Sequence, residues 1–192
     1  MSDDRRSWTR TLARSFLFVA VLTLALFATC GVWPPMVAVE SGSMSPNIQT
    51  GDLVVVTDTD GWTVAAADGP DIDTVRSPDG DPKFGAPGDV IIYDVPSRGT
   101  SVIHRAHFRV ERGENWYDRA NESYLPPDAD GCDDLRNCPA PHGGYITKGD
   151  ANPYYDQVSG IAPPVRPQWI KSKAGLRVPE LGWIRLVVVG RG

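Results

Sequence analysis

The stretch Gly51-Asp52-Leu53-Val54-Val55-Val56-Thr57 contains the pattern from which the fold can be inferred. It joins a Gly-Asp turn to a short run of apolar, β-branched residues, which is typical of a buried β-strand. Glycine supplies the unusual backbone angle of the turn, and the aspartate side chain can bond nearby backbone amides. The same arrangement recurs where Gly88-Asp89 precedes Val90–Val95 (VIIYDV). We therefore predict strands at Leu53–Thr57 and Val90–Val95.

Four further segments fit short strands. Val102–Val110 alternates apolar and polar residues, as a half-buried strand does. Tyr145–Lys148 ends at a third Gly-Asp pair, and Trp169–Lys173 and Trp183–Val189 complete the set, with no convincing amphipathic helix among them. Many short strands with non-local pairing predict a mostly β domain.

Two segments rich in Asp, Gly and Pro, 58–87 and 112–143, separate these strands. Their composition predicts loops or insertions that are too polar to contribute to the core. Cys132 and Cys138 flank a polar stretch in the second segment, and a loop-closing disulfide is the default for such a pair outside the cell. A metal site with His142 as third ligand is the alternative, although the spacing matches no standard zinc pattern.

A long apolar run precedes the β domain. Phe16–Trp33 carries no charge and is long enough to cross the bilayer core at about 1.5 Å per residue. The arginines before it indicate a cytoplasmic N-terminus. The expected organisation is a basic cytoplasmic segment (1–15), an anchor (16–33) with Trp33 at the outer interface, and an external domain (34–192).

Pro34-Pro35 is expected to end the anchor helix, because proline cannot continue its hydrogen bonds. A cleavable signal peptide is the rival interpretation. The apolar run is longer than a usual signal-peptide core, and no small-x-small cleavage site precedes Pro34. Leu186–Val189 is too short for a second crossing, so we expect a single-pass protein.

The charge balance restricts the partners. The formal net charge is −5, and lysine occurs only at positions 83, 148, 171 and 173. An acidic, lysine-poor surface is unsuited to nucleic acid. It fits either ordinary acidic solubility or a halophilic protein, because salt screening makes a high density of carboxylates tolerable.

The turn Ser41-Gly42-Ser43-Met44-Ser45-Pro46 lies a few residues beyond the expected anchor. A serine nucleophile needs an exposed turn on a rigid support, with backbone N–H groups free to receive an oxyanion. Ser43 alone would most often be a turn residue. Its significance depends on whether the other strands supply a base and an acid.

Candidates for a base and an acid follow later in the chain. His104 and His107 share one expected strand but, three residues apart, point to opposite faces. Asp150 and Asp156 follow the strand at Tyr145–Lys148, and either carboxylate could orient an imidazole. Lys148 is a competing base, because a desolvated lysine can also activate a serine.

Five sequence boxes, in this order, resemble those of type I signal peptidases. The boxes are Ser41-Gly42-Ser43-Met44-Ser45-Pro46, Gly51-Asp52, Gly88-Asp89-Val90-Ile91, Ile103-His104-Arg105 and Thr147-Lys148-Gly149-Asp150. They look most like the archaeal and endoplasmic-reticulum branch, which carries histidine where the bacterial branch carries a catalytic lysine. The segment Ala174–Pro179 with Leu181-Gly182 resembles the closing segment of that branch. Two positions depart from the family box, Ala151 in place of asparagine and Tyr155 in place of aspartate.

The resemblance implies a role for each matching residue. Ser43 matches the nucleophile and His104 the general base. Asp156 matches the essential aspartate, and Asp150 matches the supporting aspartate of the same box. Ser41 matches the serine whose hydroxyl joins the backbone N–H of the nucleophile in the oxyanion hole.

The implied activity is that of a membrane-anchored serine endopeptidase that removes signal peptides from exported preproteins at the outer face of the membrane. The implied partners are signal peptides and the lipid bilayer, with the Sec translocon a further candidate, and no cofactor or metal is implied. Two alternatives stay open. One is a Ser–Lys peptidase that uses Lys148, or a self-cleaving relative of that kind. The other is a non-enzymatic, membrane-anchored β domain that binds a partner.

Overall fold

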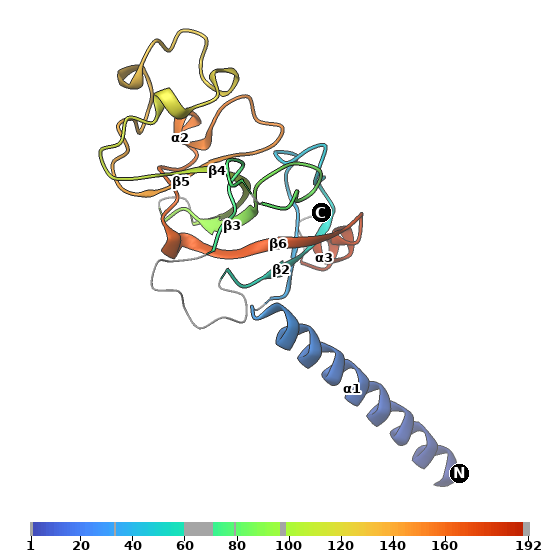
Figure 1. The fold of residues 1–192 in the computed structure, drawn as a ribbon. Coiled ribbons are helices and arrows are strands. Elements are labelled where there is room, and N and C mark those ends of the chain that lie inside the picture. Colours follow the sequence, from blue (N-terminus) through green and yellow to red (C-terminus); the bar gives the residue numbers. More distant parts are fainter. Residues whose placement is uncertain (1, 33, 60–70, 79, 97–98, 190–192) are drawn as a thin grey trace.

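The computed structural model describes residues 2–32, 34–59, 71–78, 80–96 and 99–189. A single long helix, α1 (Ser2–Cys30), projects away from a β domain (Figure 1). Within α1, the stretch Trp8–Ala25 is long and apolar enough to cross a membrane, and none of it is buried against protein. A membrane anchor and a signal sequence share this property.

The helix differs from the expected anchor at both ends. It begins at Ser2, within the basic segment, and runs without a break through Phe16, so the expected cytoplasmic segment and the expected anchor share one continuous helix. It ends at Cys30, ahead of Pro34-Pro35, because Gly31 adopts the left-handed conformation (φ 72°) that commonly terminates helices. Trp33, expected at the membrane interface, lies outside the described residues.

The β domain is built on one six-stranded sheet. Its strands are β1 (Met36–Ala38), β2 (Leu53–Thr57), β3 (Val90–Asp94), β4 (Ser101–Val110), β5 (Gly144–Lys148) and β6 (Ile170–Val178). Their order in space is β1-β2-β6-β3-β4-β5, and every neighbouring pair is antiparallel. The expected mostly β fold is confirmed, and the four expected strands from Leu53 to Lys148 match β2 to β5 within a residue at each end.

The C-terminal part departs from expectation. Trp183–Val189, expected as a strand, belongs to the helix α3 (Gly182–Val189), and β6 extends to Val178 instead of ending at Lys173. A short apolar run fits either a strand or a buried helix. The helical period is visible in burial, because Gly182 and Leu186, four residues apart, are buried while Ile184 and Val187 are exposed.

The sheet is covered on both faces. In β3, Ile91 and Tyr93 enter one hydrophobic cluster, while Val90 and Ile92 enter another. Successive side chains of a strand point to opposite faces, so this alternation shows that β3 is buried on both sides. The continuous apolar sequence of this strand is the pattern such burial produces.

The segment 112–143 builds a third hydrophobic cluster, so the expectation that it contributes no core is wrong. Trp116, Leu125, Leu135 and Ala140 are buried against β4, β5 and Tyr155. Three short 3₁₀ turns (Tyr117–Arg119, Glu122–Tyr124 and Cys132–Asp134) and the predicted Cys132–Cys138 disulfide shape the segment. It covers the end of the domain away from α1 (Figure 1). A few large apolar residues suffice for a core even among many Asp, Gly and Pro.

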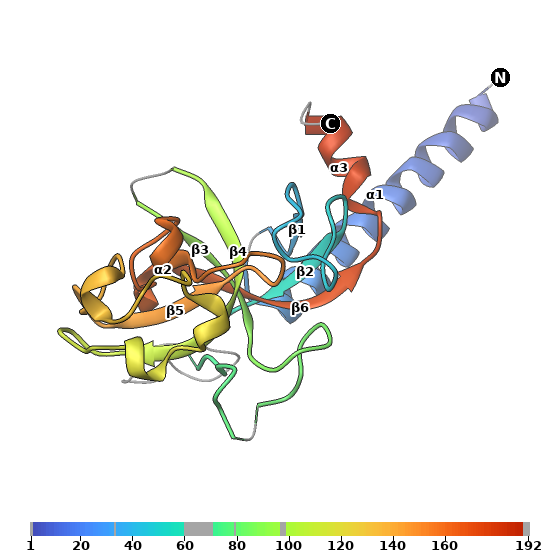
Figure 2. The same cartoon turned by 90° about the horizontal axis from the view of Figure 1, so that it is seen from above.

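The segment 58–87 is described only in part, because residues 60–70 and 79 lie outside the described set. In its described part, Ile72 is buried in the cluster that contains Ile91 and Tyr93. A viewpoint turned by 90° shows α1 and α3 leaving the sheet on the same side (Figure 2).

Candidate active site

Ser43 lies on the loop 41–52, which connects β1 to β2; we call it the nucleophile loop. Two completely buried side chains, Met44 and Ile48, anchor it in the core, and the Ile48 N–H donates to the Met44 carbonyl at 2.9 Å. Ser43 itself is only partly buried. The loop therefore presents the serine hydroxyl from a rigid turn, as a nucleophile requires.

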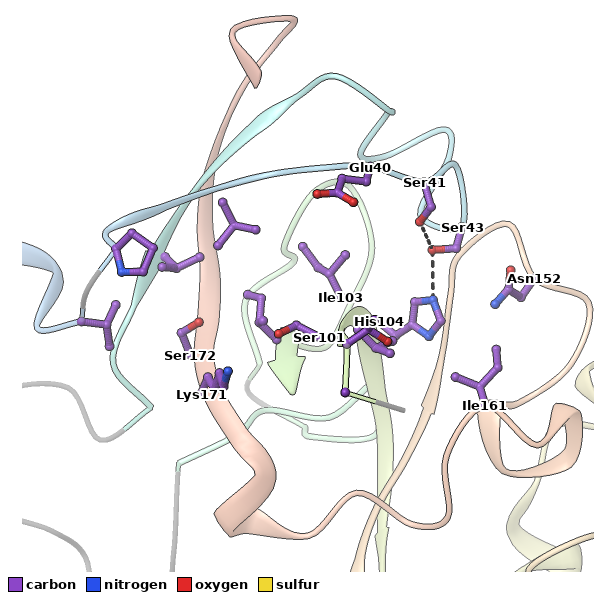
Figure 3. A pocket seen from close by; sticks show the side chains of 18 residues that line it. Glu40, Ser41, Ser43, Ser101, Ile103, His104, Asn152, Ile161, Lys171 and Ser172 are labelled. Atoms are coloured by element: carbon purple, nitrogen blue, oxygen red, sulfur yellow. Dashed lines mark hydrogen bonds between the residues drawn. The ribbon is translucent and has the colours of Figure 1, made fainter. Parts of the chain in front are cut away.

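His104, in β4, meets this serine. Its Nε2 lies 3.0 Å from Ser43 Oγ, and the imidazole is buried. Figure 3 shows the hydroxyls of Ser41 and Ser43 and the His104 ring in one line of contacts. The distance is within hydrogen-bond reach, which is the geometry a general base needs to take the serine proton.

Asp156 holds the other side of the ring. It is the first residue of a short helix, α2 (Asp156–Ser159), and its Oδ2 lies 2.7 Å from His104 Nδ1. Tyr93 and Thr147 donate their hydroxyls to the same oxygen at 2.9 and 2.7 Å. Asp156 is completely buried, and its Oδ1 has no hydrogen-bond partner among the described residues. Ser43, His104 and Asp156 thus form a continuous hydrogen-bonded chain.

Asp150 faces a different partner. Arg105 donates to both of its carboxylate oxygens, from Nε at 2.9 Å and from Nη2 at 2.7 Å, and Asn47 of the nucleophile loop donates at 2.8 Å. Burial raises the pKa of Asp150, but the hydrogen bonds from Arg105 and Asn47 outweigh that effect and lower it below its usual value. Of the two candidate acids, Asp156 contacts the imidazole and Asp150 braces the loops.

Arg105 extends this bracing. Its Nη1 donates to the backbone carbonyls of Lys83, Ala86 and Gly88 at 2.8–3.1 Å. The guanidinium is buried, and its fixed fork of donors joins the segment ahead of β3 to the turn at Asp150. The sequence boxes include Arg105, but only the structure reveals its role.

Ser41 lies beside the nucleophile. Its Oγ is 3.3 Å from Ser43 Oγ, and the side chain is exposed toward the cleft described below. A hydroxyl at this position is close enough to donate to an oxygen that develops negative charge next to Ser43. The structure therefore brings together all five residues predicted for the site. Of these, Asp150 contacts Arg105 and Asn47 and not the imidazole.

Gly149 allows this site to close. A Cβ atom built on it would lie 2.7 Å from the Ser43 carbonyl oxygen and 2.8 Å from His104 Nε2. The neighbouring Ala151 N–H donates to the same Ser43 carbonyl at 2.9 Å. In the sequence, this glycine is recognisable as part of a Gly-Asp turn and of the box Thr147-Lys148-Gly149-Asp150. Glycine is required at this position because three segments of the chain approach one another closely there.

The remaining candidate bases point elsewhere. His107 packs edge-on against Tyr124 and Tyr155, and burial lowers its pKa to about 4. Lys148 Nζ donates to the carbonyls of Gly149 and Asp150 at 2.9 and 3.3 Å and lies 4.4 Å above the Tyr124 ring. Burial also lowers the pKa of Lys148, yet its ammonium bonds carbonyl oxygens while His104 contacts Ser43.

The metal alternative finds no ligand set in the part of the chain that the structure describes, where no group of three His, Cys, Asp or Glu side chains converges. Cys132 and Cys138 are joined to each other, and His142 Nδ1 lies 3.0 Å from the Gly143 carbonyl oxygen. A disulfide offers no thiolate to a metal ion.

A cleft of about 780 Å³ opens beside the serine. Its lining includes Val56, Ile92 and Ser172 of the central strands and residues 37, 40, 41 and 99–103, and Ser43, His104 and Asn152 lie together at one side (Figure 3). Among the residues that the structure describes, β1 pairs only with β2, and the β4–β5 pairing begins at Arg105. Two strand edges with a single strand neighbour therefore border the cleft, an arrangement suited to an extended peptide.

Comparisons of the chain with protein-family models and with curated proteins find no match. Function must therefore be inferred from the geometry of the site and from the sequence boxes. Tyr93 and Thr147 were not predicted as part of the site. Both follow from strand register: Ile91 of β3 lies opposite His104 and Thr147 of β5 lies opposite Ala106, so Tyr93 and Thr147 share the face of the sheet that carries His104.

Proposed function

We propose that this chain is a serine endopeptidase whose catalytic residues are Ser43, His104 and Asp156. The observation that carries the proposal is the pair of contacts at 3.0 Å (Ser43 Oγ to His104 Nε2) and 2.7 Å (His104 Nδ1 to Asp156 Oδ2). A nucleophile, a base and a buried acid in this order form the constellation that acyl transfer uses on unrelated folds. The cleft beside Ser43 provides room for a peptide.

The reaction follows from these positions. Ser43 Oγ attacks the scissile carbonyl carbon while His104 Nε2 takes its proton, giving a tetrahedral intermediate. His104 then returns the proton to the leaving amine, the C–N bond breaks, and an acyl-enzyme remains. A water molecule, deprotonated by His104, releases the acyl group and restores Ser43. Asp156 holds the ring and stabilises the imidazolium.

Ser41 Oγ and the backbone N–H of Ser43 are the proposed oxyanion donors. The placement of Ser41, 3.3 Å from the nucleophile hydroxyl, supports this assignment. Removing one such donor typically costs on the order of 10²–10³ in kcat.

The proposed substrate is the signal peptide of an exported preprotein, bound as an extended strand along the cleft. The strand edges of β1 and of residues 101–104 would supply backbone hydrogen bonds, which hold a peptide without reading most of its sequence. The resemblance to signal peptidases implies small side chains at the first and third positions before the cut.

The proposed location is the outer face of a cell membrane, with α1 as a single-pass anchor and a cytoplasmic N-terminus. The length and apolar character of Trp8–Ala25 support a crossing, and the arginines at its start support the orientation. An anchor confines Ser43 to a narrow layer near the lipid surface, which raises the rate of encounter with a membrane-borne substrate. The bilayer and the Sec translocon are the corresponding proposed partners.

The test is cleavage of a model preprotein by the full chain reconstituted in lipid vesicles. Ser43→Ala and His104→Ala should each abolish cleavage, whereas Ser123→Ala, at an exposed position of segment 112–143, should not. Retained cleavage in Ser43→Ala would overturn the proposal and favour the non-enzymatic alternative. Cleavage that survives in His104→Ala but disappears in Lys148→Ala would favour the Ser–Lys alternative.

A further inference from the structure

Large apolar side chains gather on the outside of α3 and at the end of β6. Leu176, Ile184 and Val187 are 61%, 64% and 68% exposed, and Leu181 and Trp183 are also exposed. We call these five residues the α3 patch. Isolated exposed apolar residues are ordinary, but such a group on one short helix and its approach marks an interaction surface.

The patch is the second apolar face of α3. The first face, with Gly182 and Leu186, is buried, and α3 contacts β1 and β2. The opposite face presents Ile184 and Val187 with little protein cover, and Trp183, about half exposed, lies at its edge. A helix that is apolar on both faces needs a second apolar neighbour, because a helix exposed to water normally has a polar outer face.

The neighbourhood of the patch indicates which neighbour this is. α1 contacts β2, and α3 contacts the same strand and β1. In the view of Figure 2, both helices point away from the sheet on the same side. Trp8–Ala25 of α1 is apolar, long enough to cross a membrane and uncovered by protein. A bilayer around α1 would therefore adjoin the patch.

We propose that the α3 patch docks on the surface of the same bilayer that α1 enters. Leu176, Ile184 and Val187 would enter the boundary between headgroups and acyl chains, and Trp183 would lie at headgroup level, where its amphipathic ring is favoured. This proposal depends on α1 as an anchor and goes beyond the peptidase activity, which it does not require.

Docking would also fix the height of the nucleophile loop, because α3 is fastened to it. The Trp183 ring packs against Gly51, and the Glu180 N–H donates to Asp52 Oδ1 at 3.2 Å. Arg177 donates to the Asn47 carbonyl at 2.9 Å. These contacts connect α3 and the segment before it to residues 47 and 51–52 of the nucleophile loop, which carries Ser43.

The test measures lipid contact directly in the full chain. With Cys30 replaced by alanine and the Cys132–Cys138 disulfide intact, an environment-sensitive fluorophore is attached at Ile184→Cys and, as a matched control, at Ser123→Cys. Each protein is reconstituted in phosphatidylcholine–phosphatidylglycerol vesicles that contain lipids with a nitroxide near the headgroup end of the acyl chain. We expect nitroxide lipids to quench the label at position 184 at least threefold more than the label at position 123.

Equal, weak quenching at both positions would overturn the proposal. Energy transfer between differently labelled copies at position 184 that persists on dilution with lipid would also overturn it, since a second copy would then cover the patch. A third contrary result is a label at position 184 that is shielded in native membranes yet exposed to water in vesicles of pure lipid, because a protein partner would then be the occupant. The quenching measurement does not depend on peptide cleavage, so failure of the proposed peptidase activity in the same samples would not change its outcome.

Discussion

Arg105 and Asp150 form a bidentate ion pair, with Arg105 Nε and Nη2 at 2.9 and 2.7 Å from the two carboxylate oxygens. Arg105 directly follows the candidate base His104, and Asp150 precedes the candidate acid Asp156 by six residues. The pair therefore joins the two strands that bring the base and the acid together. It also explains why two carboxylates in one loop have different tasks.

Asp150→Ala should strongly lower the free energy of unfolding. It should lower the cleavage rate of the folded protein less. The substitution leaves the Arg105 guanidinium buried without its partner, which typically costs about 3–5 kcal/mol. Denaturant unfolding of the purified protein in detergent micelles measures the effect. A loss below about 1 kcal/mol would show that solvent reaches Arg105 easily and that the pair contributes little.

Asp156→Asn, by contrast, should lower the cleavage rate more than it lowers stability. The amide keeps the size of the side chain but places the wrong hydrogen-bonding groups opposite His104 Nδ1, so the ring loses its orientation and the imidazolium loses a counter-charge. We expect kcat to fall by roughly 10³–10⁴, with KM nearly unchanged. Steady-state cleavage of a peptide substrate measures both constants. A fall in kcat of less than tenfold would remove Asp156 from the proposed catalytic residues.

Gly149→Ala should damage the site through sterics alone. The new methyl group would meet the Ser43 carbonyl and His104 Nε2 at less than 3 Å, so one of these segments must move. We expect a loss of stability of about 1–3 kcal/mol, as for other overpacked sites, together with a large loss of cleavage. Gly131→Ala is the matched control, because its Cβ would meet no atom within 4 Å and its φ of −174° suits any residue. Equal effects of the two substitutions would contradict the close approach.

His107 predicts an acid-dependent loss of stability. Burial lowers its pKa from 6.5 to about 4, with further lowering by the charges of Lys148 and Arg105 and partial compensation by Asp150 and Asp156. Between these two pKa values, His107 binds a proton in the unfolded chain but not in the folded chain. The free energy of unfolding should therefore fall as the pH falls from 6.5 to 4, by on the order of 3 kcal/mol from this residue.

His107→Phe tests this contribution, because it keeps an aromatic ring against Tyr124 and Tyr155 and removes the titration. The slope of unfolding free energy against pH should become shallower in this window, as measured by denaturant titrations at several pH values. An unchanged slope would place the acid sensitivity elsewhere. Asp150 contributes below this window. Its lowered pKa supplies stability that is present above the ordinary pKa of an aspartate and is lost as the pH falls further.

The predictable part of the fold was the set of strands with a clear local pattern. The apolar run VIIYDV predicts a buried strand, and the alternating pattern of VIHRAHFRV predicts a half-buried one. Trp183–Val189 did not announce a helix, because its period becomes visible only when Leu186 is buried and Ile184 is not. The core contributed by Trp116 and Leu135 was hidden by the polar residues around them.

The site was predictable to the extent that short boxes carry it. Ser43, His104 and Asp156 were nominated through the resemblance, whereas spacing alone left open which acid meets the imidazole. The answer depends on the register of β4 and β5, which pairs Arg105 with Lys148 and so places Asp150 beside the guanidinium. Tyr93 and Gly149 act through contacts between segments far apart in sequence, which no local pattern encodes.

The proposed docking of α3 predicts a selective loss of activity on membrane-borne substrates. Ile184→Asp combined with Val187→Asp adds two charges to the α3 patch, and charges are strongly disfavoured at the edge of the acyl region. Both side chains are exposed, so folding should be unaffected. In vesicles we expect cleavage of a membrane-inserted preprotein to fall at least tenfold, while cleavage of a short soluble peptide stays within about twofold. Asn121→Asp with Ser123→Asp adds the same charge to the distant segment 112–143 and should change neither rate. Equal loss on both substrates would indicate that the substitutions disturb the nucleophile loop itself and not its position above the membrane.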